Sequence, residues 1–321
     1  MTVWQEKLDA GEIVILDGAI GSELEKRGVV MDDDAWCGRA MLSDPDVVRT
    51  LHDDYIAAGA DVITTNTFGT NRFALEPAGL NDRFDEINQL AVDLARQACD
   101  AADREVAVAG SISTMPALAH MDDMPSPARA ADDYRRLADR LAQAGCDLIL
   151  CEMMMTSGHA EAVVDAARGT GLPVWIGFST HRRNGTMLTY SPPRQPPAEG
   201  SDEEPRDVMG KRDFQEFAGF ARRIMADGPA AAAGIMHSEV EDTGPGLTEL
   251  KVSWSGPLLA YAHSGRFAPP EWKFVDVIEP DAYAEAAAGW VADHGVQIVG
   301  GCCGLGPDHV RALKAALPSQ L

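Results

Sequence analysis

The sequence predicts an α/β fold of the (β/α)8 type, a TIM barrel of eight parallel strands, each followed by a helix. Eight short apolar runs recur along the 321 residues, and amphipathic stretches with helical periodicity separate them. Most runs are apolar at successive positions, as in parallel strands that are covered on both faces. An open doubly wound sheet does not require eight units, so the count favours a closed barrel. No unit stands apart from the others, and we expect residues 1–321 to form a single domain.

Each predicted strand is a short run that ends at a polar or small residue. The runs are 13–17, 61–66, 106–111, 147–152, 173–179, 231–236, 257–262 and 296–301. Helical patterns follow at 44–58, 80–102, 130–144, 159–167, 213–226, 280–294 and 307–316. In the first of these, Ser43-Asp44-Pro45 supplies a capping residue and an early proline, and Gly59 ends the helix.

Two segments interrupt the repeat. Residues 121–129 are rich in Met, Pro and Asp and follow the third strand, where we expect a loop. Residues 182–212 follow the fifth strand and are long, polar and proline-rich. A loop of this length is either functional or disordered, and we expect it to lie over the barrel mouth near a donor site.

Composition excludes several classes of partner. Lys and Arg number 27 against 50 Asp and Glu, for a formal net charge of -23, which disfavours contact with nucleic acid or anionic membranes. No apolar run approaches the ~18–20 residues that a transmembrane helix needs, and the N-terminus does not resemble a signal peptide. Six cysteines are too few for a disulfide framework, so we expect a cytoplasmic protein.

Polar residues stand at the end of nearly every predicted strand, where barrel enzymes carry their active sites. They are Asp17, Asn66, Ser111, Glu152, Ser179, His237, His263, Cys302 and Cys303. Asn66, Ser111 and Ser179 suit helix capping equally well, and His263 is either a site residue or a loop residue.

The most specific motif is Gly300-Gly301-Cys302-Cys303-Gly304. Adjacent cysteines after a strand, with glycines on both sides, bring two sulfurs near one point. Thiolates suit zinc, and a catalytic zinc takes three protein ligands and keeps one position open. Buried thiols also serve as core residues, and a third ligand has to come from another strand end.

Several motifs together resemble the homocysteine S-methyltransferase family. Asp17-Gly18-Ala19-Ile20-Gly21 matches its opening, Ala109-Gly110-Ser111 and the segment that leads to Glu152 match its middle, and the Gly-Gly-Cys-Cys-Gly motif matches its close. The resemblance covers essentially the whole chain. It implies zinc-dependent transfer of a methyl group from a sulfonium or quaternary ammonium donor to the thiol of homocysteine, giving methionine.

The resemblance also implies roles for individual residues. Three cysteines bind zinc in this family, and the adjacent pair corresponds to Cys302 and Cys303. His237 stands where the family's first cysteine is expected, and Met236 stands where its neighbouring asparagine is expected. Histidine with two cysteines is an established zinc set, so we expect His237, Cys302 and Cys303 to bind the metal. The alternative is that zinc binding has been lost.

The same resemblance implies where the substrate binds. Asp17 and Glu152 are the expected catalytic residues and contact the amino acid part of homocysteine, while the turn at Gly18 and Ala19 holds its carboxylate. Asn66 is a further expected substrate contact. The alternative for Asp17 is a helix cap and for Glu152 a structural ion pair.

The methyl donor is not encoded in a readable motif. A cationic donor suits aromatic side chains, and the candidates are Trp36, Phe68, Tyr190 and Tyr261. Three other functions compete with methyl transfer to homocysteine: methyl transfer to another thiol or to a selenol, zinc-dependent hydrolysis on the same barrel, and a non-enzymatic role in redox switching or zinc storage.

Overall fold

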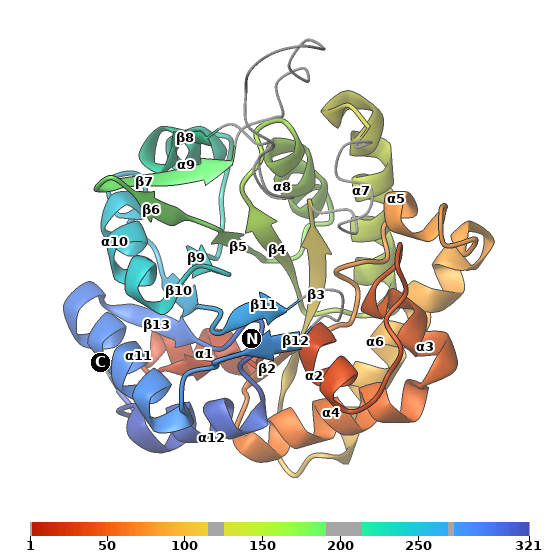
Figure 1. The fold of residues 1–321 in the computed structure, drawn as a ribbon, viewed down its shortest axis with the longest axis horizontal. Coiled ribbons are helices and arrows are strands. Elements are labelled where there is room, and N and C mark those ends of the chain that lie inside the picture. The colour runs from red at the N-terminus through yellow and green to blue at the C-terminus, as the bar shows by residue number, and fades with distance from the viewer. Residues whose placement is uncertain (1, 115–124, 191–213, 269–272, 321) are drawn as a thin grey trace.

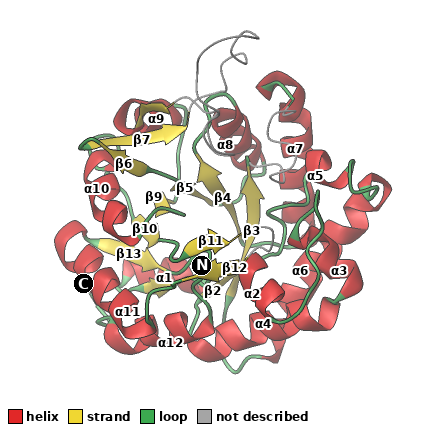
Figure 2. Ribbon diagram, in the orientation of Figure 1, coloured by secondary structure: helices red, strands yellow, loops and turns green. Residues whose placement is uncertain are grey.

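The computed structural model describes residues 2–114, 125–190, 214–268 and 273–320, and it confirms the predicted barrel. Eight parallel strands form one sheet in the order β1-β13-β10-β9-β5-β4-β3-β2, with helices around it (Figures 1 and 2). A parallel bridge between Leu16 and Val62 joins the first and last strands of that order. The Asp17 N–H donates to the Val62 carbonyl at 3.0 Å, and the Asp61 N–H donates to the Ile15 carbonyl at 2.7 Å. The sheet is therefore closed.

All eight predicted strands are present, although most are shorter than their apolar runs. They are β1 (Val14–Ile15), β2 (Val62–Thr64), β3 (Ala107–Ser113), β4 (Leu148–Met154), β5 (Val174–Phe178), β9 (Ala232–Met236), β10 (Leu258–Tyr261) and β13 (Val296–Val299). Outside the barrel lie β6 (His181–Arg183), β7 (Thr186–Tyr190), β8 (Phe214–Glu216), β11 (Arg266–Ala268) and β12 (Lys273–Val275).

The longer helices match the predicted helical patterns within a few residues. They are α4 (Pro45–Ala58), α6 (Phe84–Ala101), α7 (Pro127–Ala144), α8 (His159–Gly169), α9 (Phe217–Ala226), α11 (Pro280–His294) and α12 (Pro307–Ala316). A further long helix, α10 (Val240–Leu250), has no counterpart among the predicted patterns. Short helical segments are α1 (Val3–Asp9), α2 (Gly21–Lys26), η1 (Cys37–Arg39), α3 (Ala40–Ser43), α5 (Arg72–Leu75) and η2 (Asn81–Arg83).

The core has two layers. One set of strand side chains packs inside the barrel, among them Leu16, Trp175 and Ile298. The other set packs between the strands and the surrounding helices. Trp4 from α1 meets Trp175 edge to face, with ring centroids 5.2 Å apart, so α1 covers the end of the barrel opposite the C-terminal ends of the strands.

Some sequence predictions are wrong in detail. Residues 182–190 are not loop, because β6 and β7 pair as an antiparallel hairpin and β8 adds to β7. The remainder of the predicted 182–212 loop, from residue 191, lies outside the described residues. Helix α9 begins at Phe217 and not at residue 213, since residues 214–216 form β8. Within the segment 121–129, helix α7 already begins at Pro127.

The sequence pattern also missed α10, which carries Gly244, Pro245 and Gly246 in its middle. Glycine and proline have the lowest intrinsic helix propensities, so local sequence argues against a helix there. Burial of Leu247 and Leu250 against the barrel outweighs that cost. No helix in the described part of the chain is both long and apolar enough to span a bilayer.

Candidate metal centre and active site

Three potential metal ligands converge at the C-terminal end of the barrel. His237 follows β9, and Cys302 and Cys303 follow β13; their ligand atoms all lie within 4.8 Å of one another. His237 Nδ1 is 3.4 Å from Cys302 Sγ, and the two sulfurs are 4.0 Å apart. Tetrahedral zinc with ordinary bond lengths separates N from S by about 3.6 Å and S from S by about 3.8 Å. The three residues therefore fit a metal ion with little movement.

His237 owes its position to a strained backbone at the end of β9. Its φ is 42°, in the left-handed region that residues with a side chain rarely adopt. Its N–H donates to the Tyr261 carbonyl at 3.1 Å, which fixes it to the neighbouring strand β10. Three residues earlier, a Cβ on Gly234 would lie 1.7 Å from the Leu259 carbonyl oxygen, so β9 and β10 approach too closely there for any side chain. Strain of this kind is typical of functional sites.

Backbone hydrogen bonds join the loop that carries the two cysteines to the segment that follows β10. The Cys302 N–H donates to the Ala262 carbonyl at 2.9 Å, and the Cys303 carbonyl accepts from the Ser264 N–H at 3.1 Å. Gly304 has a φ of 83°, and a Cβ there would lie 2.2 Å from the Ser264 carbonyl oxygen. Glycine is therefore required directly after the pair, and these hydrogen bonds fix the backbone of both cysteines.

The charges of the metal-free ligands depend on one another. The hydrogen bond with Cys303, together with burial, raises the pKa of the Cys302 thiol well above its ordinary value. Burial alone would lower the pKa of His237, but the Cys302 sulfur and the charges of Glu152 and Glu239 together outweigh it, and the net shift is upward. A bound cation reverses this balance, because metals bind thiolates and neutral imidazole and release their protons.

Asp17 lies at the end of β1, only 2% exposed. Its two carboxylate oxygens accept from the N–H and the hydroxyl of Thr64, at 2.7 and 2.8 Å. Burial raises the pKa of Asp17 to about 7; the Thr64 bonds oppose that shift and the Glu152 charge adds to it. The site thus holds a carboxyl that changes charge near neutral pH.

Glu152 reaches the same mouth from an irregular part of β4. The pairing of β4 with β5 shifts register between Cys151 and Met154, and Met153 has a φ of 54°. The Glu152 carboxylate accepts a short hydrogen bond from the Ser111 hydroxyl on β3. Burial raises the pKa of Glu152, while Ser111, Tyr261 and the His237 charge lower it in part. Glu152 is therefore electrostatically coupled both to Asp17 and to the metal ligands.

The turn after Asp17 is packed tightly against the cysteine loop. The Ala19 N–H donates to the Leu305 carbonyl at 2.9 Å, and the Tyr55 hydroxyl donates to the Ala19 carbonyl at 2.6 Å. A Cβ on Gly18 would lie 2.3 Å from the Leu305 carbonyl oxygen. Glycine is needed at position 18, and the Ala19 amide is already bound within the protein.

Asn66 is 1% exposed and follows β2. Its Nδ2 donates to the Cys37 carbonyl at 2.9 Å, whereas its Oδ1 has no hydrogen-bond partner within the described chain. A buried acceptor without a donor is costly, so this oxygen is suited to meet a donor on a ligand.

The chain matches the family model described as homocysteine S-methyltransferase over residues 14–317. It belongs to the homocysteine S-methyltransferase family. The homocysteine S-methyltransferase YbgG of Bacillus subtilis is 26% identical over 329 residues, covering 97% of this chain and 96% of that protein. Betaine–homocysteine S-methyltransferase 1 of Danio rerio is 28% identical over 330 residues, covering 98% of this chain and 75% of that protein. The metallated crystal form of the Escherichia coli homocysteine methyltransferase MmuM superposes with a TM-score of 0.73 at 25% identity, covering 97% of this chain and 98% of that one.

Other residues that the sequence suggested for the site make packing contacts within this member of the homocysteine S-methyltransferase family. Trp36 and Phe68 meet edge to face at 5.7 Å. A Cβ on Gly21 would lie 2.2 Å from the Trp36 ring, so this tryptophan fills the space beside α2. Tyr261 is buried beside Glu152. The Tyr190 side chain lies outside the described part of the structure. Ser179 donates its hydroxyl to the Met236 sulfur at 3.4 Å, which gives both a packing role.

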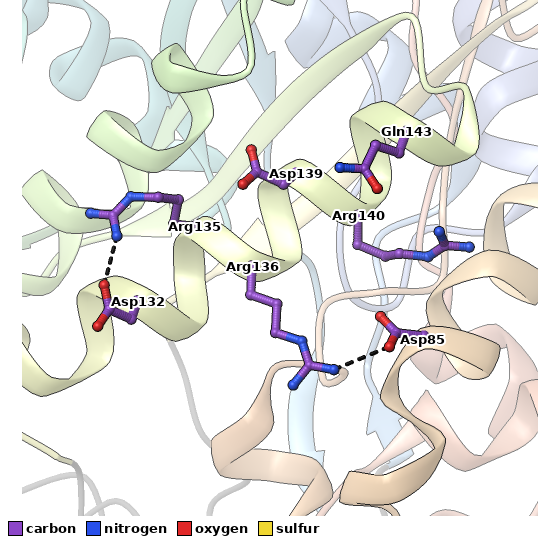
Figure 3. Close-up of a pocket in the computed structure, with 7 residues that line it drawn as sticks. All are labelled: Asp85, Asp132, Arg135, Arg136, Asp139, Arg140 and Gln143. Carbon is purple, nitrogen blue, oxygen red and sulfur yellow. Dashed lines mark hydrogen bonds and ion pairs between the residues drawn. The ribbon is translucent and has the colours of Figure 1, made fainter.

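Three residues of the site were missed by sequence reasoning. Thr64 binds the Asp17 carboxylate, Tyr55 binds the Ala19 carbonyl, and Glu239 contacts His263. Of these three, only Tyr55 carried a sequence signal, because the segment His52-x-x-Tyr55-x-x-Ala58-Gly59 of this chain also resembles the family. A hollow between α6 and α7 is lined by charges that pair with each other, such as Arg136 with Asp85 at 3.2 Å (Figure 3). None of the predicted site residues lines it.

Proposed function

We propose that this protein is a zinc-dependent methyltransferase that moves a methyl group from a sulfonium or quaternary ammonium donor to the thiol of homocysteine, giving methionine. The proposal treats residues 1–321 as one catalytic domain. The observation that carries it is the convergence of His237, Cys302 and Cys303 within 4.8 Å at the mouth that also holds Asp17 and Glu152. Family membership supplies the reaction class.

His237 Nδ1 and the two cysteine sulfurs would hold the zinc. When bound, zinc would keep the acceptor sulfur deprotonated near neutral pH. Two thiolates and a neutral imidazole leave zinc with a formal charge of 0, against -1 for three thiolates. The less negative centre should lower the pKa of the acceptor thiol further and leave its sulfur a weaker nucleophile.

Asp17 and Glu152 would bind the ammonium group of homocysteine. Both carboxyls are buried, and the Glu152 charge adds to the rise in the pKa of Asp17, so an incoming cation relieves their repulsion. Of the two turn amides expected to hold the carboxylate, Ala19 already donates to Leu305, which favours Gly18. The unpaired Asn66 Oδ1 would accept from the substrate.

The reaction is a displacement at the methyl carbon. The acceptor sulfur, having lost its proton, forms the new S–C bond with its lone pair. The bond from the methyl group to the donor sulfur or nitrogen breaks, and its electron pair returns to the donor, which leaves neutral if it began as a simple cation. The protein's part is to align the two reactants and to exclude water.

A matrix of sulfonium and betaine donors against homocysteine, with mass spectrometry of both products, tests this proposal. Cysteine and selenocysteine as alternative acceptors separate the competing methyl transfers. We expect methionine from one donor class, and loss of activity with loss of zinc in Cys302→Ser. The matched control is Cys99→Ser, since Cys99 lies on α6 away from the mouth. Turnover with cysteine or selenocysteine alone would change the acceptor, and hydrolysis without methyl transfer would contradict the proposal.

A further inference from the structure

His263 lies beside the candidate metal ligand His237, on the loop after β10. The two imidazole rings have centroids 4.6 Å apart and planes inclined at 44°. His263 Nε2 lies 3.2 Å from Oε1 of Glu239, on the loop after β9. The His263 N–H also donates to the Ser238 carbonyl at 3.1 Å, which joins the two loops.

We infer that His263, tethered by Glu239, is a positioning residue that fixes the ring of His237 in the orientation needed to bind the metal. The inference rests on the proposed function, because it assumes that His237 is a ligand. It assigns no contact with substrate to His263, which acts through His237.

The ring orientation of His237 matters because its Nδ1, not its Nε2, faces Cys302. Nδ1 is bonded directly to Cγ, so rotation of the ring about the Cβ–Cγ bond swings it away from the sulfurs. The torsion about that bond is broad for histidine, so the bond itself supplies little restraint. The His263 ring packed beside it restricts this rotation.

His263 is itself held in place by burial and by Glu239. Its side chain is 16% exposed, while that of Glu239 is 54% exposed and closes the pair from the solvent side. The Nδ1 of His263 is buried and has no hydrogen-bond partner in the described part of the chain. If His263 served only to pack against His237, an apolar ring could do so without the free-energy cost of a buried nitrogen that lacks a hydrogen bond. The imidazole differs from such a ring by the bond from Nε2 to Glu239, which is the tether.

The test measures zinc affinity by competition with a chromophoric chelator, for the wild type, His263→Ala, Glu239→Gln and the double variant. Glu241→Gln is the matched control, since Glu241 is exposed on α10 two residues further along. Loss of a residue that orients a metal-binding histidine lowers metal affinity by about 10–100-fold, and we expect this for His263→Ala. Glu239→Gln should lose less and add nothing in the His263→Ala background, and Glu241→Gln should match the wild type.

Absorption spectra of the cobalt-substituted proteins report ligand geometry directly, which a general loss of stability does not alter. We expect altered spectra in His263→Ala and in Glu239→Gln. The second variant changes an exposed carboxylate and keeps the test valid if His263→Ala fails to fold. Wild-type affinity and spectrum in both variants would overturn the inference, and additive losses would overturn the tether. His237→Ala separates the two claims: if it loses zinc while His263→Ala does not, only the inference fails, and if it keeps full affinity, both fail.

Discussion

The protonation of Asp17 should control how tightly the acceptor binds. Burial raises its pKa from 3.8 to about 7, and at 1.36 kcal/mol per unit this favours the neutral form by about 4 kcal/mol. A substrate ammonium pairs with the ionised form, which makes up about 10% of the protein at pH 6 and about 90% at pH 8 for a group with this pKa. Because the pKa is raised, the binding-competent charge is lost as pH falls through 7. Affinity for an amino acid ligand should therefore be about tenfold weaker at pH 6 than at pH 8.

Calorimetry with norvaline isolates this effect, since norvaline has the chain length of homocysteine but no thiol to lose a proton. At pH 7 binding should release about half a proton from Asp17, seen as a dependence of the heat on the buffer's ionisation enthalpy. Asp17→Asn should bind more weakly, with a smaller pH dependence. Equal norvaline affinity at pH 6 and 8 in the wild type, or an unchanged pH dependence in Asp17→Asn, would refute the reasoning.

Three further predictions concern stability and the metal. Burial lowers the pKa of His52 from 6.5 to about 4, so the folded state resists protonation of this residue and the free energy of unfolding falls as pH drops from 6.5 towards 4. Between pH 7.5 and pH 4.5, the free energy of unfolding measured with urea should therefore fall by about 2–3 kcal/mol less in His52→Leu than in the wild type. An equal fall in both proteins would contradict this prediction. Gly234→Ala forces a methyl group against the Leu259 backbone and should lower the free energy of unfolding by about 1–3 kcal/mol or more. Its control is Gly289→Ala, in open space on α11, which should raise the free energy of unfolding by up to about 1 kcal/mol. An unchanged free energy of unfolding in Gly234→Ala would contradict the prediction. His237→Cys should keep zinc, measured by elemental analysis, and a metal-free protein would show that the site needs the imidazole.

Much of the fold could be predicted because it depends on patterns within single segments. Parallel strands buried on both faces produce continuous apolar runs, and Gly59 and Gly145 end helices at a φ of 110° and 104°. Helix α10 was missed for the opposite reason, since tertiary burial outweighs Gly244-Pro245-Gly246 there. Strands β6 to β8 were missed because they are short and because β6 is polar and largely exposed, so the segment carries no strong apolar signal.

The site was predictable where one residue type implies a chemistry. The vicinal cysteines and His237 follow from the motif and from the barrel rule that strand ends meet. The contact between Thr64 and Asp17 joins side chains 47 residues apart, and the pair formed by Glu239 and His263 joins two loops. Such contacts depend on side-chain orientation between neighbouring strands, which one sequence does not specify.

The central claim is that His237, Cys302 and Cys303 hold a zinc ion that takes up the acceptor thiol. Zinc K-edge X-ray absorption on the purified protein, without and with homocysteine, tests it most directly. Without homocysteine the account predicts two sulfurs at about 2.3 Å and a histidine nitrogen at about 2.0–2.1 Å. Homocysteine should raise the sulfur count from two to three, with the nitrogen retained. A sulfur count that stays at two when homocysteine is saturating, or a zinc shell with no sulfur at all, would contradict the account.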